Sequence, residues 1–306
     1  MPPERLPAFS LIAPPYRDYL ELSPEDALPA RPGVLWGAGL VWNMDQGRAD
    51  AHLRFAAARP GGLPLLVVLP SADSLRRLRP RVLEIVEETR PHSILPQHPK
   101  PSPEEVAHLL RREPDVLAGE ILDFLIWRGL HLDQETRRIL RRMIELSADV
   151  ATLSAVARGV YLSRRALGRR FKDRGLPVPS HWLQFCRVLR AIMRLQNSDT
   201  SLFDVARAMG YPDGFTLSNQ MERILGVRPS FARERFGWEW VLEAWLLREQ
   251  ECGGLLQTLK GPTPSKEETP LEASAAAPEE AVGNPADGDT HGPADESEAK
   301  RNGAAA

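Results

Sequence analysis

The chain contains TLSAVARGVYLSRRALGRRFKDRGLPVPS (Thr152–Ser180) and, about 50 residues later, SLFDVARAMGYPDGFTLSNQMERILGVRPS (Ser201–Ser230). These stretches are two copies of one pattern, because Val156-Ala157-Arg158 in the first matches Val205-Ala206-Arg207 in the second and later apolar positions also match. Two copies are too few for a solenoid, which needs at least about three repeats to bury its faces. The sequence therefore predicts a pair of helical units.

Each copy is predicted to form a helix-turn-helix. Thr152 and Ser201 are candidate N-caps, because a hydroxyl can accept a hydrogen bond from a free amide of the first helical turn. The Val-Ala pair that follows each cap suits a close crossing of two helices. In the first copy, Ser163 is expected to cap a second helix over residues 164–173, which Gly175 ends.

The second helix of the first copy carries five cations away from its apolar face. They are Arg164, Arg165, Arg169, Arg170 and Lys172. A cationic helical face is usually only a solvated surface, but the second helix of a helix-turn-helix is the element that enters the major groove of DNA. Residues 147–236 carry fifteen Lys plus Arg against seven Asp plus Glu, a net of +8, so the remainder of the chain sums to −10. Such a basic region can neutralise the phosphates of DNA.

Residues 181–196 (HWLQFCRVLRAIMRLQ) lie between the two copies and are predicted to form one long helix. Their apolar side chains recur at three- and four-residue spacing, which places them on one stripe. The stripe consists of Trp182, Phe185, Cys186, Leu189, Ile192 and Met193. This helix spans roughly 24 Å, so it can hold two recognition helices in successive major grooves, about 34 Å apart. We expect the stripe to be core rather than a ligand site.

These features resemble the DNA-binding domain of the AraC/XylS family of bacterial transcription regulators. The resemblance covers about Asp133–Phe236, and its most specific pieces are Ser163-x3-Leu167-x-Arg169-x-Phe171-Lys172, Ala206-x3-Gly210-Tyr211 and Gly226-x2-Pro229-Ser230. It implies a leading helix over Asp133–Leu146, two helix-turn-helix units joined by a long helix, and double-stranded DNA as the partner. The aromatic residues after Phe236 predict a final helix, which extends this all-α domain to residues 133–250.

The resemblance also implies which side chains contact DNA. In the first unit Arg165, Gly168 and Arg169 would face the bases, with Arg164 and Lys172 near phosphates; in the second unit Gly214, Phe215, Ser218 and Asn219 would face the bases. Arg suits guanine and Asn suits adenine, because each can form two hydrogen bonds to that base. Gly168 is shorter than the family's usual residue, and Glu222 stands where Lys is common. We therefore expect the first unit to carry most of the affinity and base discrimination.

The N-terminal half is predicted to contain a Pro-rich irregular segment (1–32) and a small α/β module (33–115) with a parallel sheet. Its expected strands are Val34–Trp36, Leu63–Leu69 and His92–Leu95, and its expected helices are Gln46–Ala58, Ser74–Thr89 and Ser102–Arg112. An apolar connector helix is expected over residues 116–132, as a coupling element or a dimer contact. The Ala-, Pro- and Glu-rich residues 251–306 are predicted to be a disordered acidic tail.

Leu63–Arg112 loosely resembles the last third of a two-component receiver domain, through its strand, its helix and Lys100-Pro101. Only about 30 residues separate Gly33 from Leu63, too few for the strands and helices that a receiver has there. The module is therefore interpreted as a degenerate, truncated receiver, or as a small dimerisation or docking domain. A phosphoryl-controlled response regulator remains an alternative, and it would need Asp45 or Asp73 to accept the phosphate.

Other functional classes lack their signatures. The sequence shows no signal peptide, no apolar run of about 18 residues and no nucleotide-binding, nucleophile-elbow or zinc motif. Its two cysteines and seven scattered histidines suggest neither a disulfide framework nor a metal site. We expect a cytoplasmic homodimer without enzymatic activity, cofactor or metal, and RNA polymerase is a candidate partner. A low-specificity DNA-binding adaptor is a further alternative, favoured by Gly168 and Glu222.

Overall fold

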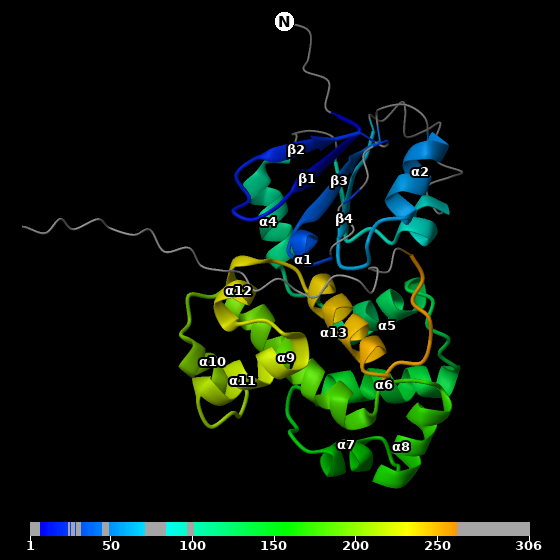
Figure 1. Cartoon of the computed structure of the whole chain (residues 1–306), viewed down its shortest axis with the longest axis vertical. Coiled ribbons are helices and arrows are strands. Elements are labelled where there is room, and N and C mark those ends of the chain that lie inside the picture. The colour runs from blue at the N-terminus through cyan, green and yellow to red at the C-terminus, as the bar shows by residue number, and fades with distance from the viewer. Residues whose placement is uncertain are drawn as a thin grey trace, which may run out of the picture. The chain divides into compact units, whose positions relative to one another are not determined.

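A computed structural model describes residues 7–23, 25, 28, 32–44, 49–70, 84–96 and 101–261 (Figure 1). The first part of the chain forms a five-stranded sheet in the order β2-β1-β3-β4-β5. The strands are β1 (Phe9–Ile12), β2 (Tyr19–Leu22), β3 (Gly39–Asn43), β4 (Leu65–Val68) and β5 (Ser93–Leu95). Strand β1 is antiparallel to both β2 and β3, whereas β3, β4 and β5 are parallel. The sheet is therefore mixed.

Helices α2 (Ala49–Ala57) and α4 (Pro103–Arg111) cover opposite faces of the sheet (Figure 1). Alternate residues of a strand point to opposite faces, and the two cores follow this rule. Leu40 and Trp42 belong to the core under α2, whereas Val41, between them, belongs to the core under α4. The continuous apolar run of β4 is thus explained, because both of its faces are buried.

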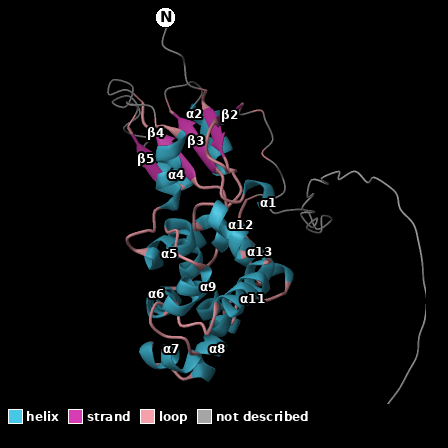
Figure 2. Cartoon of the chain, turned by 90° about the vertical axis from the view of Figure 1, so that its left-hand side faces the viewer, coloured by secondary structure: helices cyan, strands magenta, loops and turns pink. Residues whose placement is uncertain are grey.

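The chain from residue 117 to 251 is helical (Figure 2). Its helices are α5 (Leu117–Trp127), α6 (Gln134–Leu146), α7 (Leu153–Gly159), α8 (Arg164–Asp173), α9 (Pro179–Asn197), α10 (Leu202–Ala208), α11 (Gly214–Leu225), α12 (Pro229–Glu234) and α13 (Glu239–Glu251). The predicted leading helix, both helix-turn-helix units, the linking helix and the final helix are confirmed. Helix α9 lies between the units and contacts α7, α8, α10 and α11. Its apolar stripe is buried, and burial raises the pKa of the Cys186 thiol to about 12.

Side-chain caps fix where most of these helices begin. Ser102 and Glu105 form a reciprocal capping box at α4, in which each side chain accepts a hydrogen bond from the other residue's amide. The predicted caps Thr152, Ser163 and Ser201 each accept a hydrogen bond from the amide three residues later. These bonds satisfy amides that have no partner within the helix.

The structure corrects several predictions for the N-terminal half. The segment over residues 1–32 is not wholly irregular, because it supplies β1 and β2, and the sheet is not purely parallel. Residues 32–35 form the short helix α1 (Pro32–Leu35) rather than a strand, and the strand follows at β3. Of the helix predicted over residues 74–89, only 84–89 are described, and they are helical.

The receiver resemblance is limited to β4, β5 and α4. The strand order is the order 2-1-3-4-5 of flavodoxin-like sheets, but the antiparallel β1 departs from the parallel arrangement that such a sheet has. Strands β1 and β2 are joined by a short turn at residues 13–18, which leaves no room for a crossover helix. Asp45, Asp73 and Lys100 lie outside the described residues.

The start of the predicted tail is also corrected. Residues 252–261, here called the C-terminal strap, are part of the folded structure, because Leu255 and Leu259 are buried in the helical core. The Leu256 amide donates to the Gly175 carbonyl at 2.9 Å, and the Lys260 amide donates to the Arg128 carbonyl at 2.7 Å. The strap therefore runs from the end of α13 past the end of α8 to the end of α5.

Among the described helices, none combines the length and apolar content that crossing a membrane requires.

Candidate nucleic-acid interface

The two helix-turn-helix units share one turn geometry. The Leu162 amide donates to the Ala157 carbonyl, and the Tyr211 amide donates to the Ala206 carbonyl, both at 2.9 Å. The preceding residue in each turn has a left-handed backbone, with φ of 57° at Tyr161 and 72° at Gly210. The sequence repeat is therefore a structural repeat down to its hydrogen bonds.

The recognition helices α8 and α11 also have the same register. Ser163 caps α8 and Asp213 caps α11, each by accepting a hydrogen bond from the amide three residues on. Four and eight residues after each cap, a fully buried side chain faces the core: Leu167 and Phe171 in α8, Leu217 and Met221 in α11. Corresponding positions in the two helices therefore point in corresponding directions.

Helix α8 presents four cations to solvent. Arg164, Arg165, Arg169 and Lys172 are exposed, and their side chains form no ion pair or hydrogen bond with any residue that the structure describes. Gly168 lies among them, and a Cβ at this position would have no heavy atom within 4 Å. This face therefore presents cationic hydrogen-bond donors to solvent and has free space around Gly168.

Two other cations of the first unit form ion pairs with the start of α6. Arg170 donates to Glu135 at 2.7 Å, and Arg174 approaches Asp133 at 2.6 Å, so α8 is tied to the first turn of α6. A hydrogen bond from the Thr136 amide, aided by the two arginines, lowers the pKa of Asp133. Arg170, which the sequence placed on the cationic face, is therefore a tie between helices.

Helix α11 presents a different surface. Phe215 is 76% exposed, and Asn219 and Glu222 are exposed, while Ser218 is half-buried. A Cβ at Gly214 would lie 3.3 Å from Leu202 Cγ, so this glycine allows α10 and α11 to cross closely. Arg223 donates to Gln184 and Gln220, both at 2.9 Å, and so makes hydrogen bonds within the domain. Asp213 adds a carboxylate at the start of α11 that the sequence reasoning did not single out.

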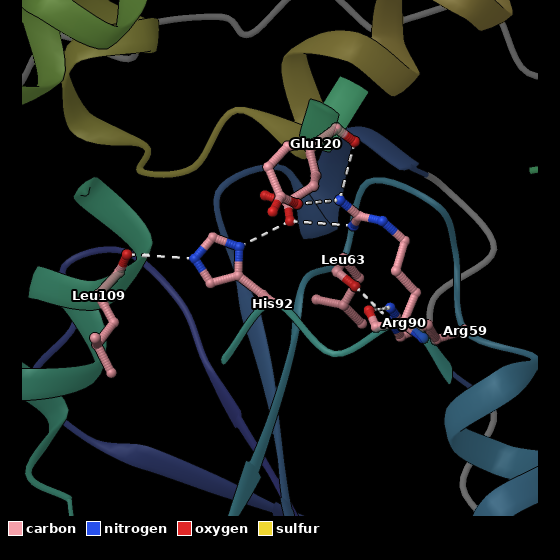
Figure 3. A network of polar contacts seen from close by, with 7 residues as sticks. Arg59, Leu63, Arg90, His92, Leu109 and Glu120 are labelled. Carbon is pink, nitrogen blue, oxygen red and sulfur yellow. Dashed lines mark hydrogen bonds and ion pairs between the residues drawn. The ribbon is translucent and has the colours of Figure 1, made fainter. Parts of the chain in front are cut away.

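A second polar cluster joins the sheet to α13, and sequence reasoning missed it (Figure 3). His92 Nδ1 lies 2.8 Å from a Glu239 carboxylate oxygen, and His92 Nε2 lies 3.3 Å from the Leu109 carbonyl. Arg90 approaches Glu239 at 3.7 Å and Glu120 at 2.8 Å. Both ring nitrogens of His92 face acceptors, so both are satisfied only when the ring is protonated. Glu239 lies 147 residues after His92 in the sequence, so no local pattern predicts their contact.

Buried charges elsewhere fasten α5 to its neighbours. Arg128 makes two hydrogen bonds to Glu243 of α13, at 2.9 and 2.6 Å, and both side chains are buried. Arg59, at the end of α2, donates to the carbonyls of Leu63 and Ala56 and lies over the Trp127 ring. Burial lowers the pKa of Arg59 to about 9. These contacts lie outside the two helix-turn-helix units and belong to the scaffold of the fold.

Comparison with known proteins agrees with this geometry. Residues 156–235 match the family model described as a helix-turn-helix domain. The raffinose operon transcriptional regulatory protein RafR of Pediococcus pentosaceus is 36% identical over 76 residues, which are 25% of this chain and 27% of that protein. The chain thus matches about a quarter of the length of this curated relative. Residues 156–235 are an AraC-type helix-turn-helix domain.

Proposed function

We propose that the chain is a sequence-specific, DNA-binding transcription regulator whose helix α8 enters the major groove. Arg165 and Arg169 would read guanine, and Arg164 and Lys172 would contact phosphates. The observation that carries this proposal is the set of four exposed cations on α8 without partners among the described residues. They lie on the second helix of a helix-turn-helix, the element that reads bases in DNA-binding proteins of this type.

The same proposal gives α11 the smaller share of the affinity. Glu222 occupies the position that corresponds to Lys172, and Asp213 corresponds to Ser163, so α11 brings two carboxylates where α8 brings a cation and a hydroxyl. Carboxylates near DNA phosphates are repelled, and neutralising phosphates dominates affinity. Gly214, Phe215, Ser218 and Asn219 would then add base contacts rather than electrostatic attraction.

The proposed assembly is a cytoplasmic homodimer, with RNA polymerase as a further partner. Of the two dimer contacts suggested by the sequence, we favour the sheet module. The predicted connector helix corresponds to α5, and most of its apolar residues are buried within the chain itself. Val116, just before α5, and Ile126 are its exposed aliphatic side chains. The sheet, by contrast, ends in two edge strands, β2 and β5, that carry exposed Leu20 and Ile94.

The test is selection from a random DNA pool with the full chain, followed by affinity measurements on the selected site. We expect Arg169→Ala to weaken binding by about 1–3 kcal/mol and to relax one base position. Asn219→Ala should cost less. Arg138→Ala removes an exposed cation from α6, outside both recognition helices, and serves as the matched control for lost charge.

Two outcomes of these measurements would contradict the proposal. A larger loss for Asn219→Ala than for Arg169→Ala would overturn the assignment of the dominant role to α8. If selection returns no motif, and Arg169→Ala and Arg138→Ala reduce the affinity for DNA equally, the protein would instead be a low-specificity DNA-binding adaptor.

A further inference from the structure

Corresponding positions of the two recognition helices carry different chemistry. Because the caps and buried residues of α8 and α11 are in register, Arg165 corresponds to Phe215 and Arg169 corresponds to Asn219. Arg165 and Arg169 are four residues apart on α8, and Phe215 and Asn219 are four residues apart on α11. Each of these two pairs therefore lies on one face of its helix, within the first six helical residues. The N-terminal part of a recognition helix is the part that contacts base edges.

Phe215 is a large apolar side chain that the fold leaves in water. It is 76% exposed on the first turn of α11, although burying a Phe ring stabilises a protein. No ring contact or cation–ring contact to Phe215 is found among the described residues, whereas nearby Phe203, 51% exposed, has the Arg207 guanidinium over its ring at 5.7 Å. Phe215 therefore offers an uncovered apolar surface where the base edges would lie.

The major groove contains one apolar group that such a ring can cover, the C5-methyl of thymine. Asn219 lies four residues further on, about 6 Å along the helix axis, which corresponds to about two base-pair steps of about 3.4 Å. Its amide can donate to and accept from the edge of adenine. Phe215 and Asn219 together thus match two A·T pairs about two base-pair steps apart, whereas the two arginines of α8 match guanines.

We propose that the two units read half-sites of opposite composition: α8 reads guanines through Arg165 and Arg169, and α11 reads A·T pairs through Phe215 and Asn219. This rests on the proposed function, since it requires specific DNA binding. The half-sites should lie about ten base pairs apart, one turn of the duplex. The less basic unit thereby adds selectivity through an apolar contact, while α8 keeps the larger share of the affinity.

The decisive probe is deoxyuridine, which pairs like thymine but lacks the methyl group. Each thymine of the A·T half-site is replaced in turn, and the affinity of the full chain is measured. At one position we expect a loss of about fourfold, the equivalent of about 0.8 kcal/mol for one methylene-sized group. Phe215→Ala should abolish this sensitivity, while Asn219→Ala and the matched control Phe203→Ala should retain it.

A gain-of-function exchange completes the test. The double substitution Phe215→Arg with Asn219→Arg should shift the selected A·T half-site toward guanine and leave the other half-site unchanged. Sensitivity to deoxyuridine that survives Phe215→Ala, or a wild-type chain indifferent to it at every thymine, overturns the inference. A guanine half-site without an A·T partner also overturns it and leaves the regulator proposal standing. Failure to select any motif instead removes the proposed function itself.

Discussion

At the scale of single residues, the two turns show how one backbone requirement is met by different side chains. The left-handed position holds Gly210 in the second unit, where glycine has no steric cost, but Tyr161 in the first. The tyrosine ring is 95% exposed, so packing does not compensate for the strained backbone. The first unit therefore carries a local cost that the second avoids.

This difference predicts opposite effects of two substitutions. Gly210→Ala should lower the free energy of unfolding by about 1–2 kcal/mol, because an added Cβ disfavours the left-handed region while meeting only Arg187 at 3.5 Å. Tyr161→Gly should raise it by up to about 1 kcal/mol, since lost strain outweighs the extra freedom of the unfolded chain. Urea unfolding measures both. Equal destabilisation by the two variants would contradict the argument.

The His92–Glu239 pair predicts a pH dependence of stability. Burial alone would lower the pKa of His92, but the Glu239 carboxylate raises it above its usual 6.5. Burial alone would raise the pKa of Glu239, but His92 lowers it below its usual 4.5. The histidine's contribution is therefore full below pH 6.5 and is lost as the pH rises through its raised pKa. The glutamate's contribution is present above pH 4.5 and is lost as the pH falls through its lowered pKa.

We expect the pair to stabilise the fold most between about pH 4.5 and 6.5. The free energy of unfolding, measured in urea from pH 6 to 9, should fall more steeply for the wild type than for His92→Gln. The neutral glutamine keeps a hydrogen-bond donor but cannot carry the charge, so it is the matched control. Parallel pH profiles for the two proteins would show that the ring is not charged in the folded state.

At the scale of elements, two leucines of the C-terminal strap differ in their burial. Leu259 is 3% exposed in the helical core, whereas Leu256 is 72% exposed. Leu259→Ala should lower the free energy of unfolding by about 2–5 kcal/mol, as core truncations do. Leu256→Ala should change it by no more than about 0.5 kcal/mol. Similar effects of the two substitutions in thermal unfolding would mean that the strap is not held against the core.

The helices of the DNA-binding domain could be predicted from sequence because their signals are local. Capping residues fix their starts, and three- and four-residue spacing fixes their buried faces. Strand β1 was missed, because Pro7 and Pro14-Pro15 flank a run of four residues whose partners lie in β2 and β3. The strap was missed for a similar reason: its two buried leucines lie in a segment of tail-like composition.

The candidate DNA-binding site could be predicted only in part from the sequence. The exposed cations of α8 followed from a helical period and a motif, but the role of Arg170 did not, since its partner Glu135 lies 35 residues earlier on another helix. A residue such as Trp36 shows the same limit. The next residue, Gly37, lies so close to Arg235 that no side chain fits there, and Arg235 comes almost 200 residues later in the sequence.

At the scale of the whole molecule, the sheet and the helices are joined by buried contacts rather than by a linker. The Tyr16 hydroxyl donates to the Gly37 carbonyl at 2.6 Å and accepts from the Phe236 amide at 2.7 Å, while its ring stacks on Phe236. Trp36 stacks on Trp240 of α13 with ring centroids 5.7 Å apart. The sheet and the helical domain are therefore expected to unfold together.

Hydrogen exchange followed by mass spectrometry tests this expectation. Peptides that cover β4 and α9 should report the same opening free energy, because cooperative units open as one. Tyr16→Phe leaves the Phe236 amide buried without its partner and should lower both values equally, by about 1–3 kcal/mol. A drop confined to the β4 peptide would reveal a sheet that unfolds on its own.

Helix α13 also has a consequence for the order in which the chain is made. Glu239 and Trp240 contact the sheet side, Glu243 neutralises Arg128, and Trp245 stacks on Phe185 with ring centroids 4.2 Å apart. All of these partners leave the ribosome before α13 does. Multidomain chains generally fold domain by domain during synthesis, but here the helical core includes residues of α13 and is incomplete until that helix emerges. Until then the sheet side also lacks its contacts with Glu239 and Trp240. A nascent chain stalled before residue 239 should therefore depend on chaperones.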